Sequence, residues 1–160
     1  KLLPRVREAY RKEETDPEIF REMGALGLLG PFIDGYECAG MNYVCYGLAA
    51  REIEAVDSGY RSMFSVQSSL VMLPINEFGT EEQKQHWLPQ IAVGDPLCAV
   101  AVTEPNYGSD VAGVRLKATR VEDGWTLNGA NTWCTFGGKA GVLMVLARTD
   151  PESRCACLPC

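Results

Sequence analysis

The chain has 160 residues, of which 46% are hydrophobic and 22% are charged, a composition typical of a folded globular protein and not of a disordered one. Its formal net charge is −6, and its Lys and Arg residues form no concentrated run, which argues against a nucleic-acid partner or an anionic membrane surface. No apolar stretch is long enough to cross a bilayer, and residues 1–10 lack the hydrophobic region of a signal peptide. We expect a soluble protein that is not secreted.

The first part of the chain carries apolar residues at helical spacing, which predicts a helical domain over residues 1–95. Asp16 followed by Pro17 is typical of a helix start, and Thr80 with Gln83 three residues later is typical of a capping box. We expect five short helices that form a bundle, over residues 2–13, 17–29, 42–56, 60–79 and 81–93.

Apolar stripes predict which faces of two of these helices are buried. On the third helix the expected core-facing stripe is Cys45, Ala49, Ile53 and Val56. On the fourth helix the residues expected to share one face are Met63, Val66, Leu70 and Leu73.

The character of the sequence changes near Pro96, after which apolar residues come in short β-rich runs between turn signals. Residues 96–160 are therefore predicted to hold part of a second domain. The expected fold class is α+β, with an all-α N-terminal domain followed by the start of an antiparallel β-barrel or sheet. We expect five strands, over residues 97–103, 114–122, 123–129, 131–136 and 141–148.

A polar stripe runs along the otherwise apolar helix predicted over residues 60–79. Arg61, Ser65 and Ser68 lie at positions i, i+4 and i+7 of this helix. An arginine among hydroxyl groups on an inward face suits an anionic group of a substrate, because the guanidinium matches a carboxylate and is costly to bury unpaired. Two alternatives stay open: Arg61 pairs with Asp57 four residues earlier, or it reaches solvent.

The segment TEPNYGSD, residues 103–110, directly follows the first predicted strand. Pro105, Gly108 and Ser109 would place backbone N–H groups and side-chain oxygens at the edge of a sheet, which is a common way to hold a phosphate or a flavin. An ordinary surface turn is the open alternative, because most clusters of this composition are turns.

The segment TWCT, residues 132–135, falls in the predicted strand over residues 131–136. Trp133 beside a threonine could stack on a planar cofactor while nearby backbone groups bond its heteroatoms. The open alternative is a tryptophan in the core.

Other kinds of chemistry have little support in the sequence. His86 lies on the charged face of its predicted helix, and no Ser or Cys has a base partner by pattern. Four cysteines lie in apolar surroundings without ligand spacing and are predicted to be reduced core residues: Cys38, Cys45, Cys98 and Cys134. We expect no metal, because the C-x-C-x-x-C tail has no fourth ligand nearby; its cysteines are Cys155, Cys157 and Cys160. If the protein is an enzyme, we expect a cofactor to supply its chemistry.

Taken together and in this order, these three segments resemble the acyl-CoA dehydrogenase family. TEPNYGSD resembles the family's T-E-P-x-x-G-S-D flavin segment, and Trp133-Cys134-Thr135 resembles its second flavin contact, usually W-I-T or W-I-S. Upstream, SGYRSMFSVQSS, residues 58–69, resembles the glutaryl-CoA branch of the family in particular. The resemblance covers about residues 20–150, with departures such as Cys134 in place of the usual Ile.

The resemblance implies FAD as the cofactor and assigns the site residues. In the glutaryl-CoA branch an Arg-Ser pair contacts the substrate, which implies Arg61 and Ser62 here and directs Arg61 to the second carboxylate of glutaryl-CoA. Ser109 would also approach the acyl-CoA. The implied flavin-binding residues are Val100, Ala101, Val102, Thr103, Glu104, Pro105, Asn106, Tyr107, Gly108, Ser109, Trp133, Cys134 and Thr135.

The reaction implied by the resemblance begins when a Glu removes an α-proton and a hydride passes from the β-carbon to flavin N5. Loss of the distal carboxylate as CO₂ then leaves crotonyl-CoA, and an electron-transferring flavoprotein accepts the electrons. The family's catalytic Glu lies in a C-terminal helical domain that nothing in this sequence matches, and neither Glu54 nor Glu104 is expected to replace it. We therefore assign no catalytic residue here and expect the isolated chain to be inactive.

The resemblance also implies a homotetramer when the protein is full length, in a bacterial cytoplasm or a mitochondrial matrix. Two alternative functions stay open: a dehydrogenase of another short or branched acyl-CoA, and a non-catalytic acyl-CoA-binding or assembly fragment.

Overall fold

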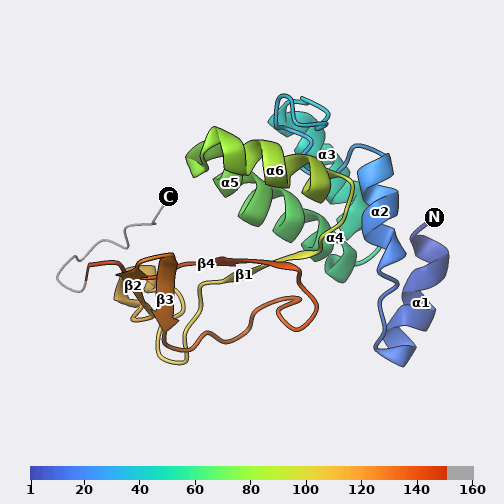
Figure 1. The fold of residues 1–160 in the computed structure, drawn as a ribbon. Coiled ribbons are helices and arrows are strands. Elements are labelled where there is room, and N and C mark those ends of the chain that lie inside the picture. Colours follow the sequence, from blue (N-terminus) through green and yellow to red (C-terminus); the bar gives the residue numbers. More distant parts are fainter. Residues whose placement is uncertain (151–160) are drawn as a thin grey trace. The chain divides into compact units, whose positions relative to one another are not determined.

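The computed structural model describes residues 1–150, which form two compact units (Figure 1). The helical unit comprises Lys1–Leu97, and the strand unit begins at Cys98. The expected fold class, a helical N-terminal domain followed by short strands, is confirmed. None of the helices in residues 1–150 is long and apolar enough to span a membrane. The C-x-C-x-x-C tail lies outside the described residues.

The helices of the helical unit are α1 (Leu3–Lys12), α2 (Glu18–Ala25), α3 (Tyr43–Glu54), α4 (Ser58–Ser65), a π-helix (Val66–Met72), α5 (Leu73–Phe78) and α6 (Glu81–Ala92). The predicted capping box of α6 is confirmed, because Thr80 Oγ1 accepts from the N–H of Gln83 and Gln83 Oε1 accepts from the N–H of Thr80. The second predicted helix ends earlier than expected, at Ala25, because the chain turns at Gly27 with a φ of +66°.

A continuous helical run over residues 58–78 joins α4, the π-helix and α5. The N–H of Leu73 donates to the carbonyl of Ser68, five residues earlier. Pro74 follows; it has no N–H, and its ring would clash with a carbonyl four residues back in a regular α-helix, so the wider turn suits this position. The extra residue in the turn rotates the following side chains about the helix axis, and Leu70, expected on the buried face, is exposed.

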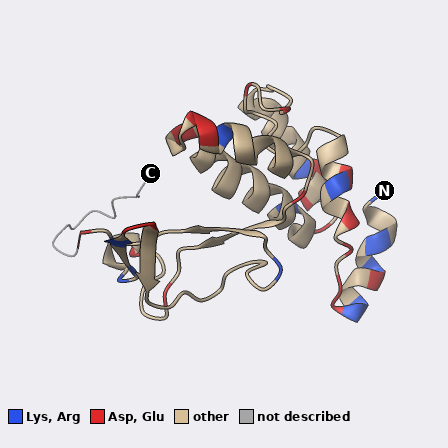
Figure 2. Cartoon of the chain, viewed as in Figure 1, with Lys and Arg blue, Asp and Glu red and all other residues tan. Residues whose placement is uncertain are grey.

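The core of the helical unit forms around this run. Its buried members in the run are Tyr60, Met63, Phe64, Val66, Gln67, Ser68, Val71, Met72 and Ile75. Helices α2 and α3 pack against α4, and α6 packs against the π-helix and α5. Charged residues are plentiful along α1 and around the start of α6 but sparse on the central run, as Figure 2 shows.

Helix α3 buries a different face from the one predicted. Ile53 is buried as expected, but Cys45 is exposed, so its prediction as a core residue is wrong. Tyr46 is turned inward instead, and its ring stacks on that of Phe64 with centroids 4.8 Å apart. The buried stripe is therefore displaced by one residue at the start of the helix.

Over residues 98–150 the strand unit contains two separate pairs of strands. β1 (Cys98–Ala101) pairs with β4 (Val142–Val145), and β2 (Lys117–Val121) pairs with β3 (Gly124–Asn128). The β2–β3 pair is an antiparallel hairpin, but β1 and β4 run parallel, which differs from the antiparallel expectation. Parallel pairing is possible because β1 and β4 are not consecutive, and the long intervening chain lets β4 return in the same direction.

The predicted strand over residues 131–136 is absent from the described structure. Trp133 and Phe136 have φ values of +55° and +65°, which lie in the left-handed region that strands do not use. Residues 131–134 instead have no regular secondary structure, and turns follow from residue 135.

Candidate functional site

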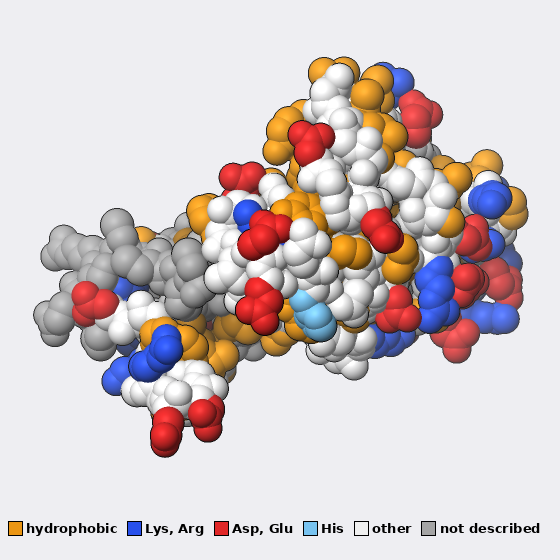
Figure 3. All heavy atoms as spheres, turned by 45° about the horizontal axis from the view of Figure 1, so that its top comes forward, with side chains coloured by type: hydrophobic (Ala, Val, Ile, Leu, Met, Phe, Trp, Pro, Cys, Tyr) orange, Lys and Arg blue, Asp and Glu red, His pale blue; other side chains and the backbone are white. Residues whose placement is uncertain are grey.

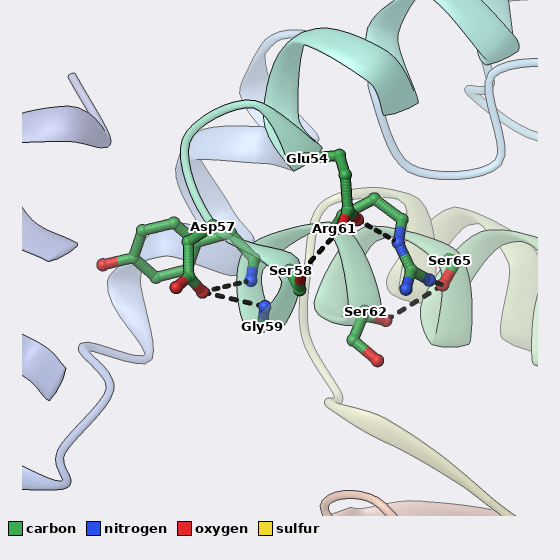
Figure 4. Close-up of polar contacts among 8 residues, drawn as sticks. Glu54, Asp57, Ser58, Gly59, Arg61, Ser62 and Ser65 are labelled. Carbon is green, nitrogen blue, oxygen red and sulfur yellow. Dashed lines mark hydrogen bonds and ion pairs between the residues drawn. The ribbon is translucent and has the colours of Figure 1, made fainter.

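Arg61 lies near the start of α4, where its partner is Glu54 at the end of α3. Its Nε donates to Oε2 of Glu54 at 2.7 Å, and its Nη1 donates to the Oγ of Ser65 at 3.0 Å (Figure 4). Asp57 instead caps α4, with Oδ1 accepting from two backbone N–H groups of the first turn. The alternative in which Arg61 pairs with Asp57 is therefore wrong.

The carboxylate of Glu54 is held from two sides. Oε1 accepts from the Oγ of Ser58 at 2.6 Å, and Oε2 accepts from Arg61. These two hydrogen bonds, that from Ser58 first, lower the pKa of Glu54 below its usual range. Glu54 therefore stays ionised at neutral pH and can orient the guanidinium.

Arg61 keeps capacity for a second partner. Three of its five N–H groups make no hydrogen bond to a described residue. Its side chain is 39% exposed and that of Glu54 is 45% exposed, so solvent reaches the ion pair. The arrangement is an oriented, partly exposed cation of the helical unit whose remaining N–H groups can donate to a carboxylate.

The serines on the predicted polar stripe and beside it have different roles in the structure. Ser62 is half-buried, and its hydroxyl makes no hydrogen bond within residues 1–150, so it is available to a ligand beside Arg61. Ser65 bonds Arg61, as described above. Ser68 is buried and accepts from the backbone N–H of Gly30 at 3.0 Å, which ties a loop to the central run. Ser68 therefore has a structural role.

The first predicted flavin segment begins in β1 and continues into a tightly bonded loop. Glu104 is only 7% exposed, and its Oε1 accepts from the backbone N–H groups of Arg115 at 2.7 Å and Leu116 at 2.6 Å. Its backbone also exchanges two hydrogen bonds with that of Tyr107. The Glu104 carboxylate therefore holds the loop together. Beyond it, the loop residues exposed to solvent are Pro105, Asn106, Gly108 and Ser109.

The second predicted flavin segment lies directly beside the first. The backbone N–H of Thr132 donates to the carbonyl of Thr103 at 2.8 Å, and Cys134 Sγ lies 3.0 Å from the carbonyl oxygen of Val100, to which it donates. The structure thus brings the two segments together, although 23 residues lie between Ser109 and Trp133 in the sequence.

Exposed aromatic and hydroxyl side chains occur in the two predicted flavin segments. Trp133 is 88% exposed, so the alternative of a core tryptophan is wrong. Thr135 and Ser109 are exposed as well, and their hydroxyls make no hydrogen bond to any residue in the described range. An exposed aromatic ring suits stacking on a planar cofactor such as a flavin, and unpaired hydroxyls in the same unit suit hydrogen bonds to its polar edge.

Other kinds of site receive no support from residues 1–150. No group of three or more potential metal ligands occurs there. His86 is exposed, and its ring contacts the neighbouring Trp87 ring edge to face; the surface view in Figure 3 shows this single histidine in pale blue.

Two residues of these clusters are not predicted by the sequence patterns. The sequence raised Glu54 only as a residue not expected to act as the catalytic base, yet in the structure it is the partner of Arg61. The sequence signal for this pair is the spacing of seven residues between Glu54 and Arg61. Because the chain between the two helices breaks at Asp57, this spacing brings the side chains together only at certain angles between α3 and α4, which the sequence does not give. Asn131, which contacts the end of β1, has no signal at all.

Two family models match nearly the whole chain. Residues 1–95 match the acyl-CoA dehydrogenase N-terminal domain, and residues 99–158 match the acyl-CoA dehydrogenase middle domain. The helical unit followed by short strands agrees with these matches. The chain therefore belongs to the acyl-CoA dehydrogenase family.

Individual relatives agree with this assignment. A mitochondrial isovaleryl-CoA dehydrogenase from Solanum tuberosum is 37% identical over 84% of this chain and 33% of its own length. Two structures of glutaryl-CoA dehydrogenase from Mycobacterium smegmatis, one in complex with FADH2, are 48% and 47% identical with TM-scores of 0.90, over 94% of this chain and 39% of theirs. A structure described as the electron transferring flavoprotein of Acidaminococcus fermentans matches at 36% identity and a TM-score of 0.86, over 92% of this chain and 39% of that one. The chain thus spans about a third to two fifths of the length of these relatives.

Proposed function

We propose that this chain is part of an FAD-dependent acyl-CoA dehydrogenase whose substrate is glutaryl-CoA. The observation that carries the choice of substrate is Arg61, an oriented cation with three N–H groups available for a second carboxylate. A glutaryl group differs from an unsubstituted acyl group by its distal carboxylate. The 48% identity to a glutaryl-CoA dehydrogenase supports the same choice.

In this proposal the substrate carboxylate binds beside Arg61 and Ser62. Glu54 keeps the guanidinium in one orientation, so little of its rotamer freedom remains to be lost when the substrate binds. Ser62 offers a hydroxyl donor next to the cation. The residues of the helical unit would therefore bind and orient the acyl end of the substrate, and we assign no residue of this chain the role of the catalytic base.

The strand unit would hold the FAD through the residues from Val100 to Ser109 and from Trp133 to Thr135. When bound, FAD would accept the hydride in the dehydrogenation. Trp133 would stack against the flavin, Thr135 would donate or accept a hydrogen bond at its edge, and Ser109 would also approach the acyl-CoA. Glu104 would contribute by holding its loop in place.

The same proposal extends to the electron acceptor and the oligomeric state of the whole protein. An electron-transferring flavoprotein would take the electrons, and the full-length protein would be a homotetramer. The similarity to a structure described as an electron transferring flavoprotein supports the first of these partners.

A second candidate substrate is a branched or shorter acyl-CoA. The 37% identity to an isovaleryl-CoA dehydrogenase favours it, because members of the family at similar distance carry names for different substrates. A branched acyl group has no distal carboxylate, so under this alternative the free N–H groups of Arg61 would have no substrate partner.

The Arg61→Ala variant of the protein encoded by the complete reading frame separates the two candidates. We expect kcat/KM for glutaryl-CoA to fall by about 10- to 100-fold, the loss typical of a charge-assisted hydrogen-bonded pair, while kcat/KM for butyryl-CoA changes less than about threefold. Arg51→Ala is the matched control, because Arg51 is an exposed arginine on α3 whose ion pair within residues 1–150 is with the adjacent Glu52. Equal losses with the two substrates would rule out the carboxylate assignment.

A further inference from the structure

We infer that Asn131 is a positioning residue that fixes the spacing between the two segments proposed to hold the flavin. The inference rests on the proposed function and deepens it, since Asn131 lies just before the segment from Trp133 to Thr135 and is not itself assigned to a ligand. It acts through the residues that follow it.

The carboxamide of Asn131 bridges two consecutive carbonyl groups just after the end of β1. Its Nδ2 lies 3.4 Å from the carbonyl oxygen of Val102 and 3.3 Å from that of Thr103. Facing two acceptors, only the NH₂ end of the amide can form hydrogen bonds, so the orientation of the group is determined. Each contact is long for a hydrogen bond, but the two share one donor group that is half-buried and partly shielded from water.

Asn131 belongs to a set of contacts made by residues on either side of Trp133 in the chain. On one side are the Asn131 contacts and the hydrogen bond from Thr132 to Thr103; on the other side is the contact from Cys134 to Val100. Between them Trp133 has a left-handed backbone with its side chain exposed. A side chain larger than glycine occupies this conformation only when its surroundings hold it there.

Removing the Asn131 donor should therefore loosen the segment on its N-terminal side. The hydrogen bond from Thr132 would be the one remaining contact described there, and Trp133 and Thr135 would sample more positions relative to Thr103. A ligand that needs both segments at a fixed distance then loses affinity, because the freedom must be removed when it binds.

The test compares three substitutions in the protein encoded by the complete reading frame. Asn131→Asp keeps the shape but turns a carboxylate without donors toward two carbonyl oxygens, Asn131→Leu removes the polar group, and Asn131→Gln keeps the NH₂ donor at a longer reach. We expect the FAD dissociation constant to rise about tenfold in the Asp variant and about fivefold in the Leu variant, and to stay within about twofold in the Gln variant. Asn128→Asp is the matched control, because Asn128 is exposed and its side chain makes no hydrogen bond to a described residue.

Two further measurements keep the outcomes distinct. Chemical unfolding shows whether each variant is folded, and amide hydrogen exchange at Thr132 reports the contact between Thr132 and Thr103 without any flavin. We expect faster exchange at Thr132 in the Asp and Leu variants than in the wild type. Unchanged FAD affinity in folded Asp and Leu variants would overturn the inference, as would losses equal to that of the control. If the wild type binds no FAD, the proposed function fails, and unchanged exchange at Thr132 would then separately overturn the role of Asn131.

Discussion

Glu54 and Arg61 form an ion pair of 2.7 Å between Oε2 and Nε across the junction of α3 and α4. They are seven residues apart, a spacing that would place them on one face of a straight helix. Here the chain breaks at Asp57, and the short connection still lets the end of α3 reach the start of α4. The cation is therefore oriented by Glu54 of the preceding helix as well as by Ser65 of its own helix.

The pKa of Glu54 gives a direct test of this pair. Ser58→Ala should raise the pKa of Glu54 toward its usual range, because the hydrogen bond from Ser58 is the largest cause of its depression; Arg61→Ala should raise it as well. Since the folded pKa is lowered, the stabilisation is present above the pKa of the unfolded chain and is lost as pH falls through the folded value. An NMR titration of the Glu54 carboxyl carbon measures both shifts. Ser62→Ala is the control, and a shift as large as that of Ser58→Ala would contradict the assignment.

Replacing Gly94 with alanine is predicted to destabilise the helical unit. It is buried with a φ of +88°, and a Cβ there would lie 2.5 Å from the carbonyl carbon of Phe20 and 2.8 Å from the backbone nitrogen of Arg21. Gly94→Ala should lower the free energy of unfolding by about 2–4 kcal/mol. Urea unfolding followed by circular dichroism at 222 nm measures the change.

Gly47→Ala provides the opposite expectation in the same unit. Gly47 lies inside α3 and is exposed, and a Cβ added there would have no neighbouring atom within 4 Å outside its own helix backbone. The substitution should raise the free energy of unfolding by about 0.5–1 kcal/mol, because alanine has the higher helix propensity. If Gly47→Ala lowered the free energy of unfolding as much as Gly94→Ala, the space available for a Cβ would not explain the effect at either position.

Glu104 should prove important for the stability of the strand unit. In Glu104→Ala the backbone N–H groups of Arg115 and Leu116 lose their acceptor, which should cost about 2–5 kcal/mol. Glu104→Gln keeps an acceptor oxygen and should cost less. Amide hydrogen exchange at Leu116 reports the change locally, and equal protection in wild type and Glu104→Ala would contradict the predicted role.

Alkylation should distinguish the cysteines by their surroundings. Burial raises the pKa of Cys98 to about 12, and burial together with the charge of Glu37 raises that of Cys38 to about 11. Both thiols are therefore protonated at pH 8. Cys45, in contrast, is exposed on α3. We expect iodoacetamide to modify Cys45 at least about tenfold faster than Cys98, as measured by peptide mass spectrometry over time. The difference should disappear in urea, and equal rates in the native protein would contradict the described burial.

Several features could be predicted from the sequence because they depend on neighbours close in the chain. The capping box of Thr80 and Gln83 needs only two residues three positions apart and a helix after them. The change from helices to strands near Pro96 follows from a change in apolar period. The family was likewise identified from short segments with fixed internal spacing, of which TEPNYGSD is one.

Other features depended on the path of the chain in three dimensions. The partner of Arg61 required the angle between two helices, and the exposure of Leu70 required the π turn before Pro74. The parallel pairing of β1 with β4 depended on a connection of 40 residues, from 102 to 141, whose course no periodicity predicts.

The sequence by itself determined the order and type of most elements, the family, and the residue types available for binding. Only the tertiary structure decided what those residues contact: Glu54 orients Arg61, and residues 100–103 hold the irregular segment in which Trp133 is exposed. The physical reason is that helix caps and apolar periods are set by interactions within one or two turns. Ion pairs and hydrogen bonds between distant segments form only after packing has brought those segments together.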